Sequence, residues 1–509
     1  MGANNAMVVI LPGVVVALAA AVVFIADLFT SRKGVLAWLA AAGLVAGAAV
    51  AVGQWITYSD GLAFNARKPE VGFAGMVSLD KYAVFCVVLF TAIGVATVML
   101  SDAYLARRHA ARGEFYGLLL LIVSGMIGLA ISTDVIAFFV SFELMSLPTY
   151  ILAGYLWRDE RSGEASIKYF VTGAFSSAIL AFGLALLYGA TGQTTYAGIA
   201  KGLSTLTAAD ARGFLVLAFV LVVTGFGFKV SAVPFHSWAP DVYEGAPTPV
   251  TAFMSTGIKA AAFAGFAKLF VLAAGVQWQL WVHTMTILAV VTMVVGNVLA
   301  LPQRNLKRML AYSSIAHAGY LMLGPIAAGT SGDNLGITAI LFYLITYALM
   351  NLGAFGTLIW IRNRRAFRYT LDEMAGLGRS MPWPGMLMAV FMVSLVGIPP
   401  TAGFWGKFYL FTAVIQADLT WLAIVAVVMS AVSAYYYLRV VWYMYFREAE
   451  AGEAATTDAA APAGVEPRTP QAGVAAAVVI CAIGVIAVGL FPGPLLHAAQ
   501  GALRAILGG

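Results

Sequence analysis

The sequence predicts an all-α polytopic membrane protein, and three observations support this fold class. Of the 509 residues, 61% are hydrophobic and only 10% are charged, whereas a soluble chain carries about 25% charged residues. The mean hydropathy is +0.90. The apolar residues also gather in long runs, and a transmembrane helix needs about 20 such residues in succession.

We count fourteen runs of this length, and each is expected to form one transmembrane span. They cover residues 7–29, 34–56, 79–101, 114–131, 133–157, 165–190, 211–233, 249–274, 278–300, 305–325, 333–361, 383–416, 419–446 and 472–491. The first run has no basic segment before it and no small-residue cleavage site, so we expect a span and not a cleaved signal. An even number of spans places both termini on one side.

The basic residues outside the spans are unevenly distributed over the two sides of the membrane. Seventeen of the 29 Lys and Arg residues lie in the odd-numbered connections, and five lie on the opposite side. Because Lys and Arg concentrate in cytoplasmic loops, both termini are expected on the non-cytoplasmic side. The net charge of +6 does not indicate a nucleic-acid partner, because these residues flank the membrane.

Residues 221–268 contain two apolar segments separated by a polar break with four prolines. Each segment carries one lysine, Lys229 or Lys259, well inside the apolar run. A charge at the bilayer centre costs about 2.5–3.5 kcal/mol on insertion scales. A broken helix is tolerated at this depth only where its backbone is buried in protein or lines a cavity. Together these features predict an ion or proton route.

The spans also suggest an internal repeat, formed by spans four to eight and nine to thirteen. Span seven is interrupted near Lys229, and span twelve is interrupted by GIPPTAG (397–403) and carries Lys407. Interrupted helices at corresponding positions are typical of inverted-repeat transporters. We expect five segments: an N-terminal three-helix segment (1–110), a first repeat (111–275), a second repeat (276–447), a flexible Ala-, Glu- and Pro-rich linker (448–471) and a final span (472–509).

Glu143 lies about nine residues into span five, which is roughly 14 Å deep. It could exchange protons with, or pair to, the candidate relay lysines Lys229, Lys259 and Lys407; a structural ion pair is the competing interpretation. Making and breaking a buried Lys–Glu pair is worth roughly 4–7 kcal/mol. Moving one charge against about 150–200 mV costs roughly 3.5–4.6 kcal/mol. Such a pair is therefore strong enough to gate one proton, although it cannot supply the energy.

Two histidines are further candidates for the proton path. His317 lies in the middle of a span and could link two half-channels, because histidine titrates near neutral pH. A hydrogen-bonded core histidine is the competing interpretation. His236, in VPFHSW, lies in or next to the break.

Other charged residues are expected to be structural. Lys268 faces away from Lys259 on the same helix and is expected to snorkel toward the membrane surface. Asp134 is expected to cap the helix of span five, and Lys168 to pair with Glu164. Anchoring roles at the interfaces are expected for Asp27, Asp80 and Lys81.

The sequence contains no pattern typical of a cofactor or metal site. Cys86 and Cys481 both lie in apolar runs and are expected to be small core residues. We find no metal-ligand spacing, Gly-rich phosphate loop or haem motif. No redox chemistry is therefore expected in this chain.

Several long motifs resemble one known family. They are FELMSLPTYILAGY (142–155), KYFVTGAFSSAILAFG (168–183), GFKVSAVPFHSWAPDVYEGAPTPVTAFMS (227–255), NLKRMLAYSSIAHAGYL (305–321) and AYYYLRVV (434–441). Together they resemble the subunit N family of NADH-quinone oxidoreductase, an antiporter-like membrane subunit of respiratory complex I. The motif YEGAPTPVTAF, a lysine in span eight and a lysine in span twelve favour subunit N over the related subunits L and M.

The resemblance implies fourteen spans with two inverted five-helix repeats, in the inner membrane of a bacterial cell. It implies a proton path through the span-five glutamate and the lysines of spans seven, eight and twelve, which are Glu143, Lys229, Lys259 and Lys407. It places FMN, iron–sulfur clusters and quinone on partner subunits, with no cofactor in this chain. Neighbouring antiporter-like and small membrane subunits, together with lipid, are the implied partners. The linker at 448–470 is longer than is usual in the family.

Three other functions remain open from the sequence. A subunit of a stand-alone multi-subunit cation/proton antiporter would share the broken helices and would show sodium-dependent transport. A solute transporter would need a polar pocket, whereas the charged residues here lie singly along a line. A purely structural membrane subunit would leave the four charges near mid-depth unexplained.

Overall fold

The computed structural model describes residues 3–59, 70–206, 209–332, 335–364, 367–448 and 472–504, and this part of the chain is almost entirely helical. Its strands are β1 (Glu70–Gly72) and β2 (Val77–Leu79), which pair antiparallel with Glu70 opposite Leu79; the short η1 (Phe73–Gly75) lies between them. The expected linker lies almost wholly outside the described residues.

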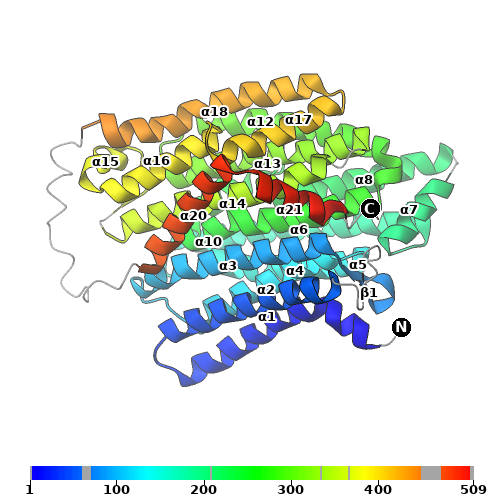
Figure 1. Cartoon of the computed structure of the whole chain (residues 1–509), viewed down its shortest axis with the longest axis horizontal. Helices are drawn as coiled ribbons and strands as arrows, with labels where there is room; N and C mark the ends of the chain where they lie inside the picture. Colours follow the sequence, from blue (N-terminus) through cyan, green and yellow to red (C-terminus); the bar gives the residue numbers. More distant parts are fainter. Residues whose placement is uncertain are drawn as a thin grey trace.

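Three N-terminal helices form one edge of the bundle. They are α1 (Ala3–Phe29), α2 (Gly34–Ser59) and α3 (Lys81–Ala106), and the three lie side by side in Figure 1. Gly43 and Gly47 of α2 face Ala19 and Val16 of α1 so closely that an added Cβ would collide with them. Small residues therefore let these helices approach, as is common in lipid.

The next group of helices covers the region of the first expected repeat. It consists of α4 (Gly113–Ile131), α5 (Val135–Ala153), α6 (Glu160–Thr191), α7 (Tyr196–Thr205), α8 (Ala209–Val230), α9 (Trp238–Gly245), α10 (Thr248–Phe253), the π-helical turn η2 (Met254–Ile258) and α11 (Lys259–Leu272). The segment from α10 to α11 is continuous and buried through almost its whole length.

The remaining helices complete the bundle. They are η3 (Gly275–Leu280), α12 (Val282–Ala300), α13 (Leu306–Ser331), α14 (Leu335–Arg362), η4 (Asp372–Met374), α15 (Leu377–Ser380), α16 (Pro382–Val396), α17 (Ala402–Gln416), α18 (Thr420–Phe446), α20 (Ala472–Leu490) and α21 (Gly493–Arg504). Helices α13 and α14 run through the centre of the bundle in Figure 1 and are buried along most of their length.

Twelve of the described helices are long and apolar enough to cross a membrane, or thirteen if the pair Asp372–Ser380 and Pro382–Val396, bent by 118°, counts as one span. Two further segments of the fourteen-span prediction are helical but are not among the twelve. Helix α13 has 26 residues and carries many polar side chains, and α16 and α17 have only 15 residues each. The described chain is therefore a polytopic membrane protein built almost entirely of helices.

Helical structure is interrupted at both places that the sequence predicts. Helix α8 ends at Val230, Ser231 has a positive φ of 63°, and α9 begins only at Trp238. Helix α16 ends at Val396, and Gly397 follows with a φ of 91°, a value that glycine adopts without strain. The chain resumes as α17 at Ala402 after two prolines.

The C-terminal segment contains a second helix that was not predicted. The last expected span ends near residue 491, but the chain continues after Pro492 as a further helix, α21. The carbonyl oxygen of Gly489 accepts a hydrogen bond from the indole nitrogen of Trp405 at 2.8 Å. The end of α20 therefore packs against the beginning of α17, next to the interruption between α16 and α17.

Candidate functional site

Glu143 and Lys229 lie together where α5 meets the end of α8. Lys229 is 1% exposed, and its ammonium donates a hydrogen bond to the hydroxyl oxygen of Ser146 at 2.7 Å. Glu143 lies one helical turn before Ser146 and within electrostatic range of the lysine, and one of its carboxyl oxygens is buried without a hydrogen-bond partner among the described residues. The lysine also faces the rings of Phe142 and Tyr150, 4.9 and 5.6 Å from their centroids. We call Glu143, Ser146 and Lys229 the first cluster.

Lys259 begins α11, directly after the π-helical turn η2, and is 2% exposed. Its ammonium donates to both the carbonyl oxygen and the hydroxyl oxygen of Ser314 on α13, at 2.6 and 2.5 Å. A π turn changes the phase of the residues that follow it and is frequent at functional sites. Here the turn precedes the lysine that reaches across to α13.

His317 lies one turn beyond Ser313 and Ser314 on α13 and is bonded on both ring nitrogens. Its Nδ1 lies 2.5 Å from the hydroxyl of Tyr343, and its Nε2 lies 3.0 Å from the hydroxyl of Tyr437. The hydroxyl of Tyr437 is also hydrogen bonded to Ser313. A neutral imidazole donates from one nitrogen and accepts on the other, and a hydroxyl can do both. This arrangement can therefore pass a proton along α13.

Lys407, on α17, turns back toward the interrupted end of α16. Its ammonium donates to the carbonyl oxygens of Leu395 and Val396 at 3.0 and 2.8 Å, and to the hydroxyl of Ser430 on α18 at 2.8 Å. The last carbonyls of a helix have no partner within the helix and carry partial negative charge. The lysine thus caps the first half of the broken helix across the gap.

The candidate relay lysines, Glu143, His317 and their hydrogen-bond partners form two groups near the interrupted helices. We call the following residues the second cluster: Lys259, Ser313, Ser314, His317, Tyr320, Tyr343, Lys407, Ser430 and Tyr437. Tyr320 connects its ends, because its ring lies 5.3 Å from the ammonium of Lys407 and 5.8 Å from the ring of His317. In the described part of the chain, no direct hydrogen bond joins Lys229 to Lys259.

His236 lies in the turn between α8 and α9, which is the break where the sequence places it. Its side chain is half-buried. Its Nδ1 is buried and has no hydrogen-bond partner among the described residues. The structure does not bring this histidine into direct contact with the first or second cluster through a hydrogen bond.

The prediction that Lys268 snorkels to the membrane surface is wrong. The residue is 2% exposed, and its ammonium forms an ion pair with Asp80 at 3.0 Å and donates to the carbonyl oxygen of Ala130 at 3.1 Å. Helix α11 is enclosed on all sides, so even the face opposite Lys259 meets protein. The other oxygen of Asp80 accepts from the backbone N–H of Ala83 and caps α3.

Two structural predictions are confirmed. Asp134 caps α5, where its Oδ1 accepts a hydrogen bond from the N–H of Ile136 at 2.7 Å. Lys168 pairs with Glu164 at 2.5 Å and also with Asp241 of α9 at 2.8 Å. The second ion pair ties α6 to the helix that follows the first interruption.

Basic residues at the start of α13 hold α9 in place, a role that the sequence analysis missed. The ammonium of Lys307 donates to the carbonyl oxygens of Glu244 and Ala246, both at 2.7 Å, and so caps the end of α9. Arg308 pairs with Asp241 at 2.7 Å and with Glu244 at 3.1 Å. In the sequence these two basic residues only mark a loop on the basic side of the membrane.

A buried tyrosine fixes the start of α10 nearby. Tyr369 lies in the connection between α14 and α15, and its hydroxyl is 2.7 Å from the hydroxyl of Thr248. Burial raises the pKa of Tyr369 to about 12, so the hydroxyl stays neutral and available for this hydrogen bond.

The hydroxyl partners of the lysines and of His317 were also missed. Ser146, Ser430, Tyr343 and Tyr437 lie in apolar helices, where the sequence offers no signal that separates them from ordinary packing residues. Only the packing of distant helices reveals them. Among the described residues, no group of three or more His, Cys, Asp or Glu side chains could hold a metal ion.

Interrupted helices beside buried charges within a helical bundle are typical of membrane proteins that move ions or small solutes. The family model described as NADH:quinone oxidoreductase/Mrp antiporter, TM matches residues 132–433, and the chain belongs to this family. Within it, the chain is 42% identical over 500 residues to NADH-quinone oxidoreductase subunit N of Trichlorobacter lovleyi, covering 98% of this chain and 97% of the relative. The resemblance to subunit N that the motifs indicate is thereby confirmed.

Two solved structures share the fold. A chain of respiratory complex I from Thermus thermophilus with bound Aureothin is 32% identical, with a TM-score of 0.76, covering 96% of this chain and all of that chain. A chain of the Mrp complex from Dietzia sp. DQ12-45-1b has a TM-score of 0.82 at 22% identity, covering 99% of this chain and 98% of that chain. At that identity the second likeness concerns the fold alone.

Proposed function

We propose that this chain is the proton-translocating subunit N of a respiratory NADH:quinone oxidoreductase, in which quinone reduction in other subunits drives proton movement. The hydrogen-bonded string from Ser313 through Tyr437 to His317 and Tyr343, beside the contact of Lys259 with Ser314, is the observation that carries this proposal. Each member can both give and take a proton through a neighbour. The relatives named NADH-quinone oxidoreductase subunit N support the assignment of this chain to that enzyme.

The first cluster acts as the gate in this proposal. Lys229 is held on Ser146 beside Glu143, which has a free buried carboxyl oxygen. When the ammonium of Lys229 leaves Ser146 and pairs with the carboxylate of Glu143, the two charges come closer together. In a medium of low dielectric this strongly changes the electrostatic potential that a nearby proton experiences. A switch of this kind can raise or lower the barrier to a proton without moving a helix.

The end of the second cluster receives the proton at Lys407. A charged Lys407 is stabilised by the exposed carbonyls at the end of α16, and a neutral one leaves these carbonyls without a cationic partner. Glu143, Lys229, Lys259 and Lys407 carry the path in this proposal, with His317 as the link in the second cluster. His236, which no hydrogen bond joins to either cluster, has a secondary place.

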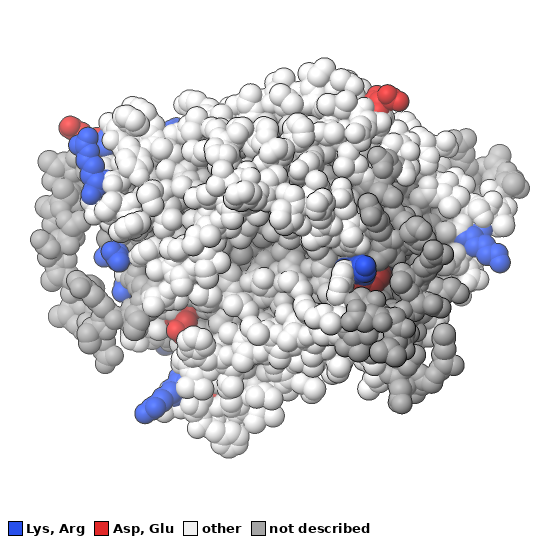
Figure 2. All heavy atoms as spheres, in the orientation of Figure 1, with Lys and Arg blue, Asp and Glu red and all other residues white. Residues whose placement is uncertain are grey.

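We further propose that the chain has fourteen spans, two inverted five-helix repeats and both termini on the non-cytoplasmic side of a bacterial inner membrane. Helix α13 and the broken pair α16–α17 supply the two spans beyond the twelve. Both chain ends lie in the right half of Figure 1. Most of the Lys and Arg side chains visible in Figure 2 lie at the opposite end, which supports a cytoplasmic assignment for that end.

FMN, iron–sulfur clusters and quinone belong to partner subunits in this proposal, and this chain holds no cofactor. Its partners are the neighbouring antiporter-like and small membrane subunits and the surrounding lipid. The second candidate function is a subunit of a stand-alone cation/proton antiporter, which the fold match to the Mrp complex supports. The higher identity to subunit N over nearly the whole chain favours the first function.

Proton pumping by the assembled oxidoreductase in vesicles tests the proposal. Glu143→Ala and Lys229→Ala are each expected to depress NADH-driven pumping at least tenfold, while the exposed controls Glu160→Ala and Lys201→Ala retain it. Wild-type pumping in both cluster variants would refute the assignment. Transport that requires sodium, and that persists without the other oxidoreductase subunits, would support the stand-alone antiporter instead.

A further inference from the structure

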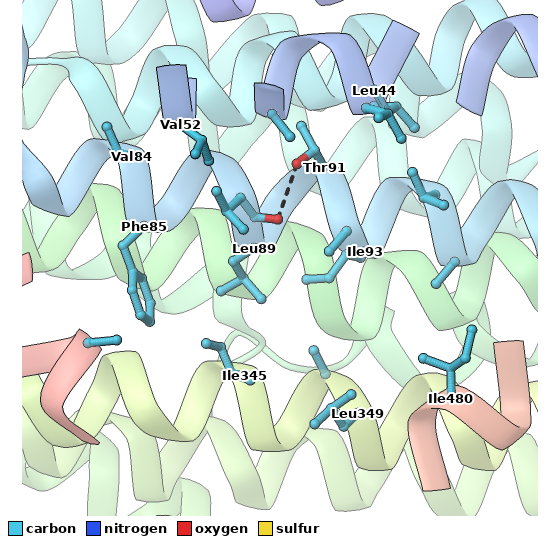
Figure 3. Close-up of a pocket in the computed structure, with 18 of the residues that line it drawn as sticks. Leu44, Val52, Val84, Phe85, Leu89, Thr91, Ile93, Ile345, Leu349 and Ile480 are labelled. Atoms are coloured by element: carbon cyan, nitrogen blue, oxygen red, sulfur yellow. Dashed lines mark hydrogen bonds between the residues drawn. The ribbon is translucent and has the colours of Figure 1, made fainter. Parts of the chain in front are cut away.

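A large apolar cavity lies away from both clusters, between helices α2, α3, α14, α20 and α21. Its volume is about 940 Å³, near the upper end of ordinary ligand pockets. Figure 3 shows Phe85 and Leu89 of α3 extending toward α14, which carries Ile345 and Leu349. The cavity is open on one side along α2 and α3, where Val52 and Val88 are each 40% exposed.

The lining offers almost nothing to water. Thr91 is the polar residue in its middle, and its hydroxyl donates back to the carbonyl oxygens of Val87 and Val88. Figure 3 draws one of these two bonds as a dashed line. Ordered water needs about two to four polar partners. An apolar occupant therefore suits this space.

The cavity has a charged end. The α3 residues that line it run from Lys81, the first residue of the helix, to Met99, which is about 27 Å along the axis. This length is close to the roughly 30 Å thickness of the hydrocarbon layer. The ammonium of Lys81 lies 5.0 Å from the ring centroid of Trp55, and the lysine is exposed and makes no ion pair within the described residues. Trp and Lys at a helix end mark the level of the lipid headgroups.

Charge decides which occupant fits. The described residues that line the cavity include two basic side chains, Lys81 and His497, and no acidic one. A partner's transmembrane helix would present an apolar surface all along and would leave Lys81 unpaired. A molecule with an apolar body and an anionic group at one end satisfies both the apolar walls and the ammonium.

We propose that this cavity is a binding site for an anionic glycerophospholipid. Its acyl chains lie against Phe85, Val88, Leu89 and Leu349, and its phosphate is bound by Lys81 beside Trp55. The site joins α2 and α3 to the last two helices, α20 and α21, through lipid. This inference is independent of the proton path.

Photolabelling of the assembled complex in bilayers tests the site. The probe is phosphatidylglycerol with a photoactivatable group on an acyl chain, and the label is located by peptide mass spectrometry. Peptides of α3 and α20 are expected to carry the label, at least threefold less in Lys81→Gln and at least tenfold less in Val88→Trp. The control Ile25→Trp, at an exposed position of α1 that does not line the cavity, keeps the wild-type labelling.

Each other result overturns the proposal. Equal labelling in wild type and Val88→Trp means that the lipid does not enter the cavity. Equal labelling by the phosphatidylcholine analogue, or no loss in Lys81→Gln, removes the anionic headgroup contact. Preferential labelling by a photoactivatable quinone, or a cross-link from another subunit at Val88, identifies a different occupant. If Val88→Trp fails to assemble, Lys81→Gln and the two lipid probes still decide.

Discussion

The ammonium of Lys229 donates a hydrogen bond to the hydroxyl of Ser146, with 2.7 Å between the two atoms. The serine hydroxyl in turn donates to a carbonyl oxygen of its own helix, so its oxygen is oriented to accept from the lysine. Glu143 lies one turn away and forms no direct ion pair with this lysine within the described chain. The serine thus holds the lysine beside the carboxylate without joining the two.

Ser146→Ala is the most direct test of this arrangement. A hydrogen bond to a charged group is worth about 1.5–3 kcal/mol, and part of this would be recovered by pairing with Glu143. We expect pumping to fall about three- to tenfold, which corresponds to roughly 0.7–1.4 kcal/mol. Thr149→Val is the matched control, because among the described residues the hydroxyl of Thr149 bonds only to the carbonyl of Met145 in its own helix. Equal effects of the two changes would remove Ser146 from the gate.

Tyr437→Phe tests the hydrogen-bonded string in the second cluster. The change leaves the Nε2 of His317 and the hydroxyl of Ser313 without their common partner. Because the string is then open, we expect at least a tenfold loss of pumping with normal assembly of the complex. Tyr82→Phe is the control, since the hydroxyl of this buried tyrosine donates to the carbonyl oxygen of Ala264 and is not part of the second cluster. Normal pumping in Tyr437→Phe would mean that protons take another route.

Lys407→Met tests whether the lysine supports the interruption as well as the proton path. The carbonyls of Leu395 and Val396 lose their donor, so the end of α16 should open more often. We expect abolished pumping and faster hydrogen–deuterium exchange in a peptide covering 395–402. Ser430→Ala removes one neutral partner of the lysine and a long, 3.4 Å hydrogen bond to the carbonyl oxygen of Val396, so it should slow pumping a few-fold and raise this exchange less than Lys407→Met does. Unchanged exchange in Lys407→Met would restrict the residue to proton transfer.

The sequence was informative wherever a feature depends on the chain's own local pattern. Apolar runs located the helices, and prolines with glycine located the interruptions after Val230 and at Gly397. Lysines inside apolar runs stand out because a charge there is costly. These signals are local, and they place Lys229 and Lys407 next to broken helices without any knowledge of packing.

Features that depend on distant contacts could not be predicted. Tyr437 is 120 positions from His317, and Asp80 is 188 positions from Lys268. From the sequence alone, a tyrosine in a membrane helix cannot be distinguished from an ordinary packing residue. The helical pattern also predicts that the face of α11 opposite Lys259 points away from the protein, although Lys268 on that face is buried. The π turn before Lys259 was likewise invisible, because Met254–Ile258 has no residue that marks it.

The buried pair of Asp80 and Lys268 yields a prediction about stability. Its side chains are 4% and 1% exposed, and breaking a buried ion pair by removing one partner costs about 3–5 kcal/mol, because the other charge is left uncompensated. Lys268→Met should therefore lower the thermal stability of the assembled complex strongly. Asp80→Asn keeps the side-chain oxygen that caps α3 through the N–H of Ala83, so the double variant Asp80→Asn/Lys268→Met should recover most of the loss.

The pair of Lys33 and Asp27 provides the control for this comparison. Its side chains are 33% and 17% exposed, and an ion pair open to solvent contributes about 0–1 kcal/mol. Lys33→Met should therefore change the unfolding temperature little. Two outcomes would contradict the buried pair and indicate that the lysine reaches solvent. One is an equally small change of the unfolding temperature in Lys268→Met; the other is a double variant at Asp80 and Lys268 whose loss of stability equals the sum of the two single losses. Thermal unfolding of the four variants, followed by loss of the assembled complex on heating, distinguishes these outcomes.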